Sequence, residues 1–125
     1  MSSEFELIDR HFRRLGRARP DVVRGIGDDC ARVTVPEGHE LAVSIDTLAA
    51  GVHFPEITSP EDLGWKSLAC GLSDLAAAGA EPAWATLAVT LPRGPDPDAW
   101  LDAFVHGFGE LAAEHGVAVV GGDTT

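Results

Sequence analysis

Apolar residues near the amino terminus recur three or four positions apart. Phe5, Ile8, Phe12 and Leu15 follow this spacing, and Gly16 comes directly after them. Positions separated in this way share one face of an α-helix, and glycine commonly ends one. The pattern predicts a short amphipathic helix over residues 5–15, with arginines on its solvent-facing side.

A longer helical pattern begins after Ser59. Ser59 can cap the helix, Pro60 suits its first turn, and Gly79 with Pro82 is expected to end it. The predicted apolar stripe consists of Leu68, Leu72, Leu75 and Ala76. At 100° per residue Asp74 falls well away from that stripe, beside small side chains. Its carboxylate is therefore expected to be open to a ligand.

A third helix is expected after the turn at residues 93–97, and three segments show the patterns of strands. Residues 41–46 alternate between apolar and small or polar side chains, which predicts a strand buried on one face with Ser44 and Asp46 pointing the same way. Residues 83–92 predict a long strand. Residues 117–120 predict a short buried strand, with Asp123 just past its carboxyl end, where ligands often bind.

The amino-acid composition limits the classes of protein to which this chain can belong. The 125 residues are 45% hydrophobic, enough for one core, so residues 1–125 are expected to form one domain. The formal net charge is −11, which disfavours nucleic acid and anionic membranes as partners and favours cations. A solvated acidic face or a salt-adapted host would explain the same charge.

The sequence offers no secretory signal and no apolar run of membrane-spanning length. We therefore expect a cytoplasmic protein. Cys30 and Cys70 form no C-x-x-C pair, and both are interpreted as small buried thiols without a chemical role.

Four acidic motifs carry the candidate chemistry. Each places an aspartate at a strand end, beside glycine or in a short polar run, and the motifs are GIGDD, SIDT, LSDLAA and GGDTT. Any one of them alone is more often a turn or cap. Together they would repel one another unless cations hold them ionised, and such hard oxygen ligands suit Mg²⁺, which in turn binds phosphate. No P-loop or complete dinucleotide-binding motif is present.

Longer stretches resemble a known family. GIGDDCA, SIDTLAAGVHF, LGWKSLACGLSDLAAAGAEPAWATLAVTLP and VAVVGGDTT, in this order, resemble the amino-terminal half of the bacterial thiamine-monophosphate kinases. That family belongs to a superfamily with aminoimidazole ribonucleotide synthetase and selenophosphate synthetase. The resemblance implies an enzyme that transfers the γ-phosphoryl group of ATP to thiamine monophosphate, giving thiamine diphosphate, with several Mg²⁺ ions.

The resemblance also implies roles for individual residues. Those matching metal ligands are Asp29, Ser44, Asp46, Asp74 and Asp123, with Asp28 as a less certain partner. Gly122 and Asp123 would meet ATP, and His53 would meet the substrate. His106 falls near a position that contacts nucleotide in some relatives, although a histidine on a helix surface is the better explanation. Ile45 stands where relatives often have Thr, which puts one metal site in doubt.

The fold implied is an α+β domain, a mixed β-sheet with helices packed on one face, which pairs with a second copy into a barrel-like homodimer. Family members continue into a second α/β domain, whereas this chain stops two residues after Asp123, so we expect it to be an amino-terminal fragment that is inactive alone. Two alternatives stay open. One is a sister ATP-dependent synthetase, which the GVHF segment disfavours, and the other is a non-catalytic acidic dimerisation domain.

Overall fold

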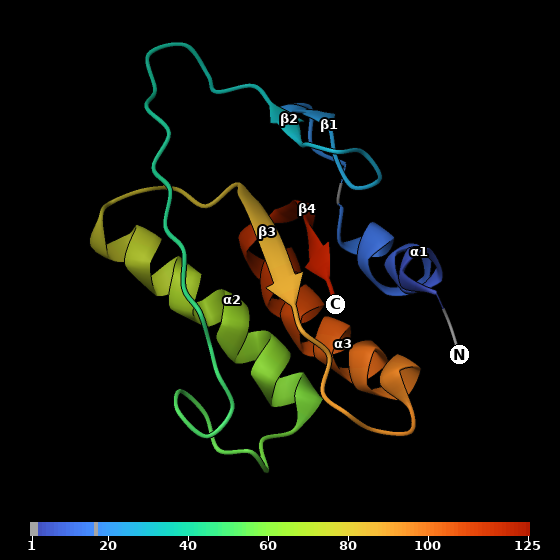
Figure 1. Ribbon diagram of the computed structural model, residues 1–125. Helices are drawn as coiled ribbons and strands as arrows, with labels where there is room; N and C mark the ends of the chain where they lie inside the picture. Colours follow the sequence, from blue (N-terminus) through green and yellow to red (C-terminus); the bar gives the residue numbers. More distant parts are fainter. Residues whose placement is uncertain (1–2, 17) are drawn as a thin grey trace.

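The computed structural model describes residues 3–16 and 18–125 (Figure 1). Its helices and strands alternate in an α+β arrangement, as expected from the sequence. In chain order the elements are α1 (Glu4–Leu7), the π-helical turn η1 (Ile8–Phe12), the 3-10 turn η2 (Arg13–Leu15), β1 (Val22–Arg24), β2 (Arg32–Val33), α2 (Pro60–Ala77), β3 (Trp84–Val89), α3 (Pro97–His115) and β4 (Ala118–Thr124).

The strands of the described residues form two separate two-stranded sheets, where the sequence predicted one mixed sheet. β1 and β2 pair antiparallel, and β3 and β4 pair parallel. β4 is longer than predicted: it runs through the two glycines, and Asp123 pairs with Ala88 of β3. The expectation that Asp123 lies past the end of the strand was therefore wrong, because the ladder with β3 continues to Thr124.

Both long helices begin and end where their capping residues predict. The Ser59 hydroxyl accepts a hydrogen bond from the Asp62 amide at 3.2 Å, and Asp96 accepts one from the Ala99 amide at 3.0 Å. Such caps satisfy amides that have no partner inside the helix. Gly116 ends α3 in the left-handed conformation, with φ of 67°, which glycine adopts without strain.

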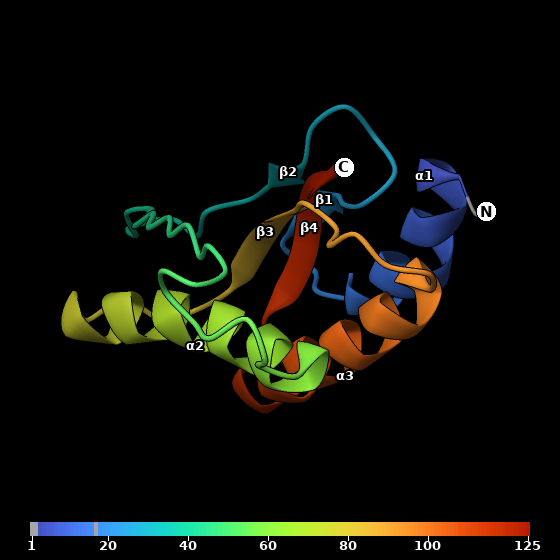
Figure 2. The ribbon, with the colours of Figure 1, turned by 60° about the horizontal axis from the view of Figure 1, so that its bottom comes forward.

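Two glycines allow α2 and α3 to cross in close contact. A Cβ atom on Gly64 would lie 2.0 Å from the carbonyl oxygen of Phe104, and one on Gly107 would lie 1.9 Å from that of Glu61. The two helices lie together against one face of the β3–β4 sheet (Figure 2). No helix in residues 3–16 and 18–125 is both long and apolar enough to cross a membrane.

The core lies between α3, α2 and the β3–β4 sheet, and the amino-terminal helical segment closes one end of it. The most deeply buried large side chains are Leu101, Val105, Val117 and Val119. The predicted apolar face of the first segment is partly wrong, because Phe5 is 80% exposed while Leu7 and His11 are buried. His11 is held by Asp98 of α3, with 2.9 Å between Nε2 and Oδ1.

Residues 41–46 are not a strand, contrary to the prediction. They run beside α2 without pairing to any described strand (Figure 1). None of the described residues covers the apolar side chains of this alternating pattern, since Val43 is 80% and Ile45 91% exposed. The pattern thus describes an apolar surface that one copy of the chain leaves open to solvent.

Candidate functional site

The segment at residues 41–46 brings two predicted ligands to a third. The Ser44 hydroxyl donates a hydrogen bond to Oδ2 of Asp74 at 3.0 Å, and the carboxyl group of Asp46 lies close enough to Asp74 to interact with it. Asp74 lies on the last turns of α2 and is exposed, as its place off the apolar stripe predicted. Three oxygen-bearing side chains that are up to 30 positions apart in sequence therefore meet in one place.

The pKa of Asp46 shows how these carboxylates affect one another. The hydrogen bond to Asp74 and the negative charge of Asp74 raise the pKa of Asp46 above its usual value, and the nearby His53 opposes this rise. Two ionised carboxylates in contact repel each other. A divalent cation would neutralise that repulsion, and the oxygen-only ligand set fits Mg²⁺. We refer to Ser44, Asp46 and Asp74 as the Ser44–Asp74 cluster.

The loop between β1 and β2 carries the GIGDD motif and points its polar side chains to solvent. Asp28 accepts a hydrogen bond from the Asp29 amide at 2.8 Å and pairs with Arg24 at 3.2 Å. Gly27 takes a φ of 109°, which a side chain would strain. The Asp29 carboxylate is exposed. Cys30 is exposed too, so the expectation of a buried thiol was wrong there.

β4 presents the GGDT motif through a very close approach to β3. A Cβ atom on Gly122 would lie 1.9 Å from the carbonyl oxygen of Leu87, so only glycine fits without a shift of the strand. The register of the two strands changes just before this point, between Ala85 and Thr86 of β3. Asp123 follows with an exposed side chain. Gly122 thus allows the close approach of β4 to β3, and the next residue of the motif, Asp123, exposes its carboxylate.

The structure brings some of the predicted ligands together and leaves others apart. Ser44, Asp46 and Asp74 are in contact. Within the described part of the chain, Asp29 and Asp123 make no side-chain hydrogen bond to that cluster. A cavity of about 240 Å³ is lined by the start of the GIGDD loop together with residues 118–120 of β4, which precede the GGDT motif.

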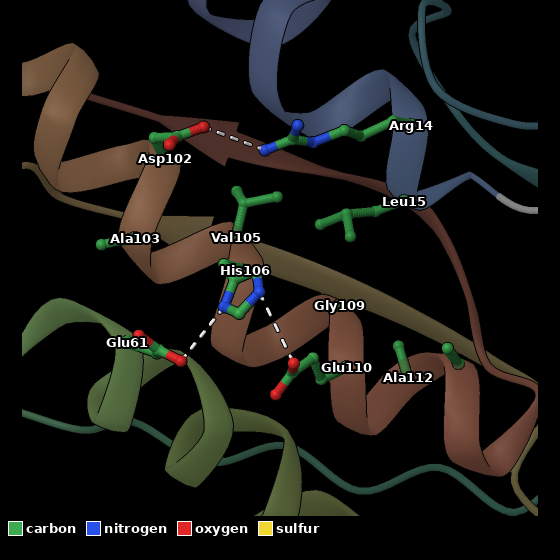
Figure 3. Close-up of a pocket in the computed structure, with 11 residues that line it drawn as sticks. Arg14, Leu15, Glu61, Asp102, Ala103, Val105, His106, Gly109, Glu110 and Ala112 are labelled. Carbon is green, nitrogen blue, oxygen red and sulfur yellow. Dashed lines mark hydrogen bonds and ion pairs between the residues drawn. The ribbon is translucent and has the colours of Figure 1, made fainter.

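His106 lies on the exposed surface of α3 between two glutamates. Its Nδ1 is 3.1 Å from Glu61 of α2, and its Nε2 is 3.5 Å from Glu110 one turn along α3 (Figure 3). The three side chains border a cavity of about 780 Å³ that also receives Arg14. Among the histidine, cysteine, aspartate and glutamate side chains of the described residues, only this trio brings three possible ligand atoms within 4.8 Å of one another.

Sequence reasoning did not select Glu61 or Glu110. The spacing of His106 and Glu110, four positions apart on a helix, was a signal for their contact, but nothing in the sequence placed Glu61 beside them. Both ring nitrogens of His106 face carboxylates, so ion pairing alone accounts for this arrangement. A negatively charged nucleotide would meet two like charges here.

A family model describes most of this chain. Residues 27–125, from the GIGDD loop to the last residue, match the model for "AIR synthase related protein, N-terminal domain". The chain belongs to this family. The match begins inside the β1–β2 loop and includes every predicted site residue of this AIR synthase related domain.

Curated relatives of this AIR synthase related domain carry one name. The thiamine-monophosphate kinase of Salmonella typhimurium is 52% identical over 122 residues, and that of Bacillus subtilis is 37% identical over 123 residues. These alignments cover 98% and 97% of this chain but 37% of each relative. The chain therefore spans little more than a third of the length of the curated relatives it matches.

A solved structure shares the fold. The crystal structure of thiamine-monophosphate kinase from Stenotrophomonas maltophilia K279a superimposes with a TM-score of 0.82 at 50% sequence identity, covering 98% of this chain and 38% of that one. The helices and strands described above thus have the arrangement found in one part of that kinase.

Proposed function

We propose that this chain is the amino-terminal, metal- and ATP-binding part of a thiamine-monophosphate kinase, which transfers the γ-phosphoryl group of ATP to thiamine monophosphate. The observation that best supports this proposal is the Ser44–Asp74 cluster, a set of oxygen ligands that tertiary contacts bring together. The chain that holds it matches such kinases over nearly its whole length. Phosphoryl transfer needs positioning and charge neutralisation more than a strong base, which suits such a ligand set. A cytoplasmic location fits the use of ATP.

Five side chains would hold the magnesium ions of this enzyme: Asp29, Ser44, Asp46, Asp74 and Asp123. When bound, Mg²⁺ would neutralise the charge that develops on the transferred phosphoryl group. The chain's own part is to orient these oxygens. The Ser44 hydroxyl fixes one oxygen of Asp74, and a bound cation would relieve the repulsion between the carboxylates of Asp46 and Asp74. Asp28 is engaged by Arg24, which favours Asp29 as the ligand of its loop.

The nucleotide would approach the β4 motif. Gly122 leaves the backbone of β4 without a side chain beside Asp123, so that phosphates can lie close to the sheet edge. His53 would contact thiamine monophosphate, since it lies close enough to Asp46 to influence that carboxyl. A nucleotide contact for His106 rests on the resemblance alone, and its two carboxylate partners argue against it.

We further propose that two copies of the chain pair through the exposed segment at residues 41–46 and the β3–β4 sheet. Val43 and Ile45 expose large apolar side chains from a segment with strand alternation, and no described residue covers them. Strand pairing between two copies would bury them and satisfy open backbone groups. A barrel-like homodimer is the arrangement that this surface supports.

The two alternative functions are a related enzyme with a different substrate and a domain without catalytic activity. A sister ATP-dependent synthetase would keep the same metal ligands, but the curated relatives cited above are all named thiamine-monophosphate kinase. A purely structural acidic domain gives no reason to bring the carboxylates of Asp46 and Asp74 together, because like charges in contact repel each other.

The deciding experiment measures ADP formation by the full-length protein that contains this chain, with Mg-ATP and thiamine monophosphate. Turnover that depends on both substrates and on Mg²⁺ is expected. Aminoimidazole precursors and selenide serve as competing substrates in parallel reactions. Turnover with one of these and none with thiamine monophosphate would contradict the proposal.

A further inference from the structure

Lys66 connects α2 to the turn that carries His53. It is the only lysine of the chain, and its ammonium group donates a hydrogen bond to the main-chain oxygen of His53 at 2.6 Å. The side chain is half-buried on the second turn of α2. A charge-assisted bond of this length is stronger than a bond between neutral groups, so it ties the turn to the helix.

The turn itself is closed by its own backbone. The amides of Val52 and His53 both donate to the carbonyl oxygen of Ala49, at 3.1 and 2.9 Å, and the Gly51 amide donates to Phe54 at 2.8 Å. Gly51 has a φ of 75°, which lets the chain reverse there. The position of the turn relative to the rest of the molecule, however, depends on what it contacts outside, and the hydrogen bond from Lys66 is such a contact.

The same turn fixes the neutral ring of His53 in one tautomer. The Ala49 amide donates to Nδ1 of His53 at 2.9 Å. A backbone N–H can only donate, so Nδ1 must accept and the proton of the neutral ring lies on Nε2. The ring thereby offers an Nε2–H donor on an exposed side chain, close enough to Asp46 for the two to interact electrostatically.

We infer that Lys66 is a positioning residue: it holds the turn at residues 49–54 so that the Nε2–H of His53 faces the anionic phosphate group of the substrate. This rests on the proposed function for the identity of that substrate. An N–H donor is what a phosphate oxygen requires, and the Ser44–Asp74 cluster would hold cations on the same side. Lys66 contributes through His53, since its ammonium group is already bonded to the main chain.

The first test reads the ring of His53 directly. Long-range ¹H–¹⁵N correlation spectra distinguish Nε2–H from Nδ1–H histidines, and we expect the pure Nε2–H pattern for His53 in the unmodified chain. Lys66→Met, which keeps the length of the side chain and removes the donor, should keep the Nε2–H pattern, because the Ala49 amide that fixes it lies in the same turn. It should instead shift the amide signals of residues 49–54, because the turn loses its tie to α2. Lys66→Arg should leave those amide signals near their original positions. Ser67→Ala is the matched control, because Ser67 bonds only to Leu63 of its own helix.

The second test measures kinetics in the full-length protein that contains this chain. Lys66→Met should raise the KM for thiamine monophosphate by roughly tenfold, the size expected when one charge-assisted hydrogen bond to substrate is misdirected. The KM for ATP should stay unchanged, and Lys66→Arg should recover most of the loss. Circular dichroism and the melting temperature of each variant separate this effect from unfolding.

The outcomes are distinct. Amide signals of residues 49–54 that stay unchanged in a folded Lys66→Met chain overturn the inference, and so does a rise in the KM for ATP alone, which would make Lys66 a nucleotide contact. If these amide signals change as expected but His53→Gln leaves the KM for thiamine monophosphate unaltered, Lys66 still positions His53, and the substrate role proposed for His53 is the part that fails.

Discussion

The hydroxyl of Ser44 donates to the carboxylate of Asp74 across 3.0 Å, joining an extended segment to the end of a helix 30 positions later. Neither residue is buried, and Asp74 lies off the apolar side of α2. Nothing in the packing of the core requires this contact. Its consequence is chemical, because it fixes one oxygen of the exposed Asp74 carboxylate and leaves the other without a bond to Ser44.

Removing the charge of Asp74 should abolish activity and leave the fold intact. We expect Asp74→Asn in the full-length protein to lose at least a hundredfold in kcat, since an amide binds Mg²⁺ weakly and carries no charge to share among ions. The measurement is ADP formation at saturating Mg-ATP. Asp62→Asn is a matched control with the same charge change on the same helix, and it should retain activity. Near-normal turnover of Asp74→Asn would remove it from the ligand set.

Asp46 should make stability depend on pH in a defined direction. Because its pKa is higher in the folded chain than its ordinary value of 3.8, the folded state holds more protons just above that pH, and stability falls there as pH rises. Thermal melts of Asp46→Asn should lack this fall, and Mg²⁺ should reduce it in the unmodified chain. Asp21 acts in a separate window: Arg19 lowers its pKa to about 2, so its contribution is lost only as pH falls below about 4.

Control melts with Asp62→Asn decide whether the effect is local. This variant removes one exposed carboxylate without touching Asp46 and should keep the fall in stability above pH 4. If stability falls with pH equally in Asp46→Asn and in the unmodified chain, the pair of Asp46 and Asp74 has no part in the pH dependence.

Gly122 should tolerate no side chain. Gly122→Ala would place a Cβ atom 1.9 Å from the Leu87 carbonyl oxygen, so β4 must shift, at a cost of about 2 kcal/mol or more in the free energy of unfolding. Gly121→Ala is the matched control, because nothing lies within 4 Å of the added atom. Urea unfolding of the two variants measures the difference. Equal stability would mean that the close approach of the strands is not maintained in solution.

The exposed segment at residues 41–46 should cause self-association. Size-exclusion chromatography with light scattering is expected to give a dimer for the unmodified chain and a monomer for Ile45→Ser, because the substitution replaces apolar surface that pairing would bury. Ile57→Ser changes a residue that is 95% exposed outside this segment and should leave the dimer intact. A monomeric unmodified chain at high concentration would refute the pairing.

The sequence predicted the elements whose signals are local. Helices α2 and α3 begin at Ser59 and Asp96 as predicted, because capping depends on residues three positions apart. The strand at residues 84–89 was also confirmed. The place of Asp74 off the apolar stripe followed from helical geometry alone, and its exposure agrees.

The sequence did not predict the features that depend on contacts between distant segments. Residues 41–46 have the alternation of a strand, but a strand needs a neighbour, and none of the described residues supplies one. β4 continues through two glycines because β3 lies close enough to pair with them, which its composition did not reveal. The bond from Lys66 to His53 likewise joins two segments whose proximity only the tertiary structure defines.

The central claim is that the four aspartate motifs gather around common metal ions, and paramagnetic Mn²⁺ tests it most directly. Mn²⁺ accepts the same oxygen ligands as Mg²⁺ and broadens the NMR signals of amides near it. Substoichiometric Mn²⁺ added to the chain should selectively broaden the amides around Asp29, Asp46, Asp74 and Asp123, and excess Mg²⁺ should reverse the effect. Broadening confined to Glu61, His106 and Glu110, or spread evenly over the acidic surface, would contradict the account.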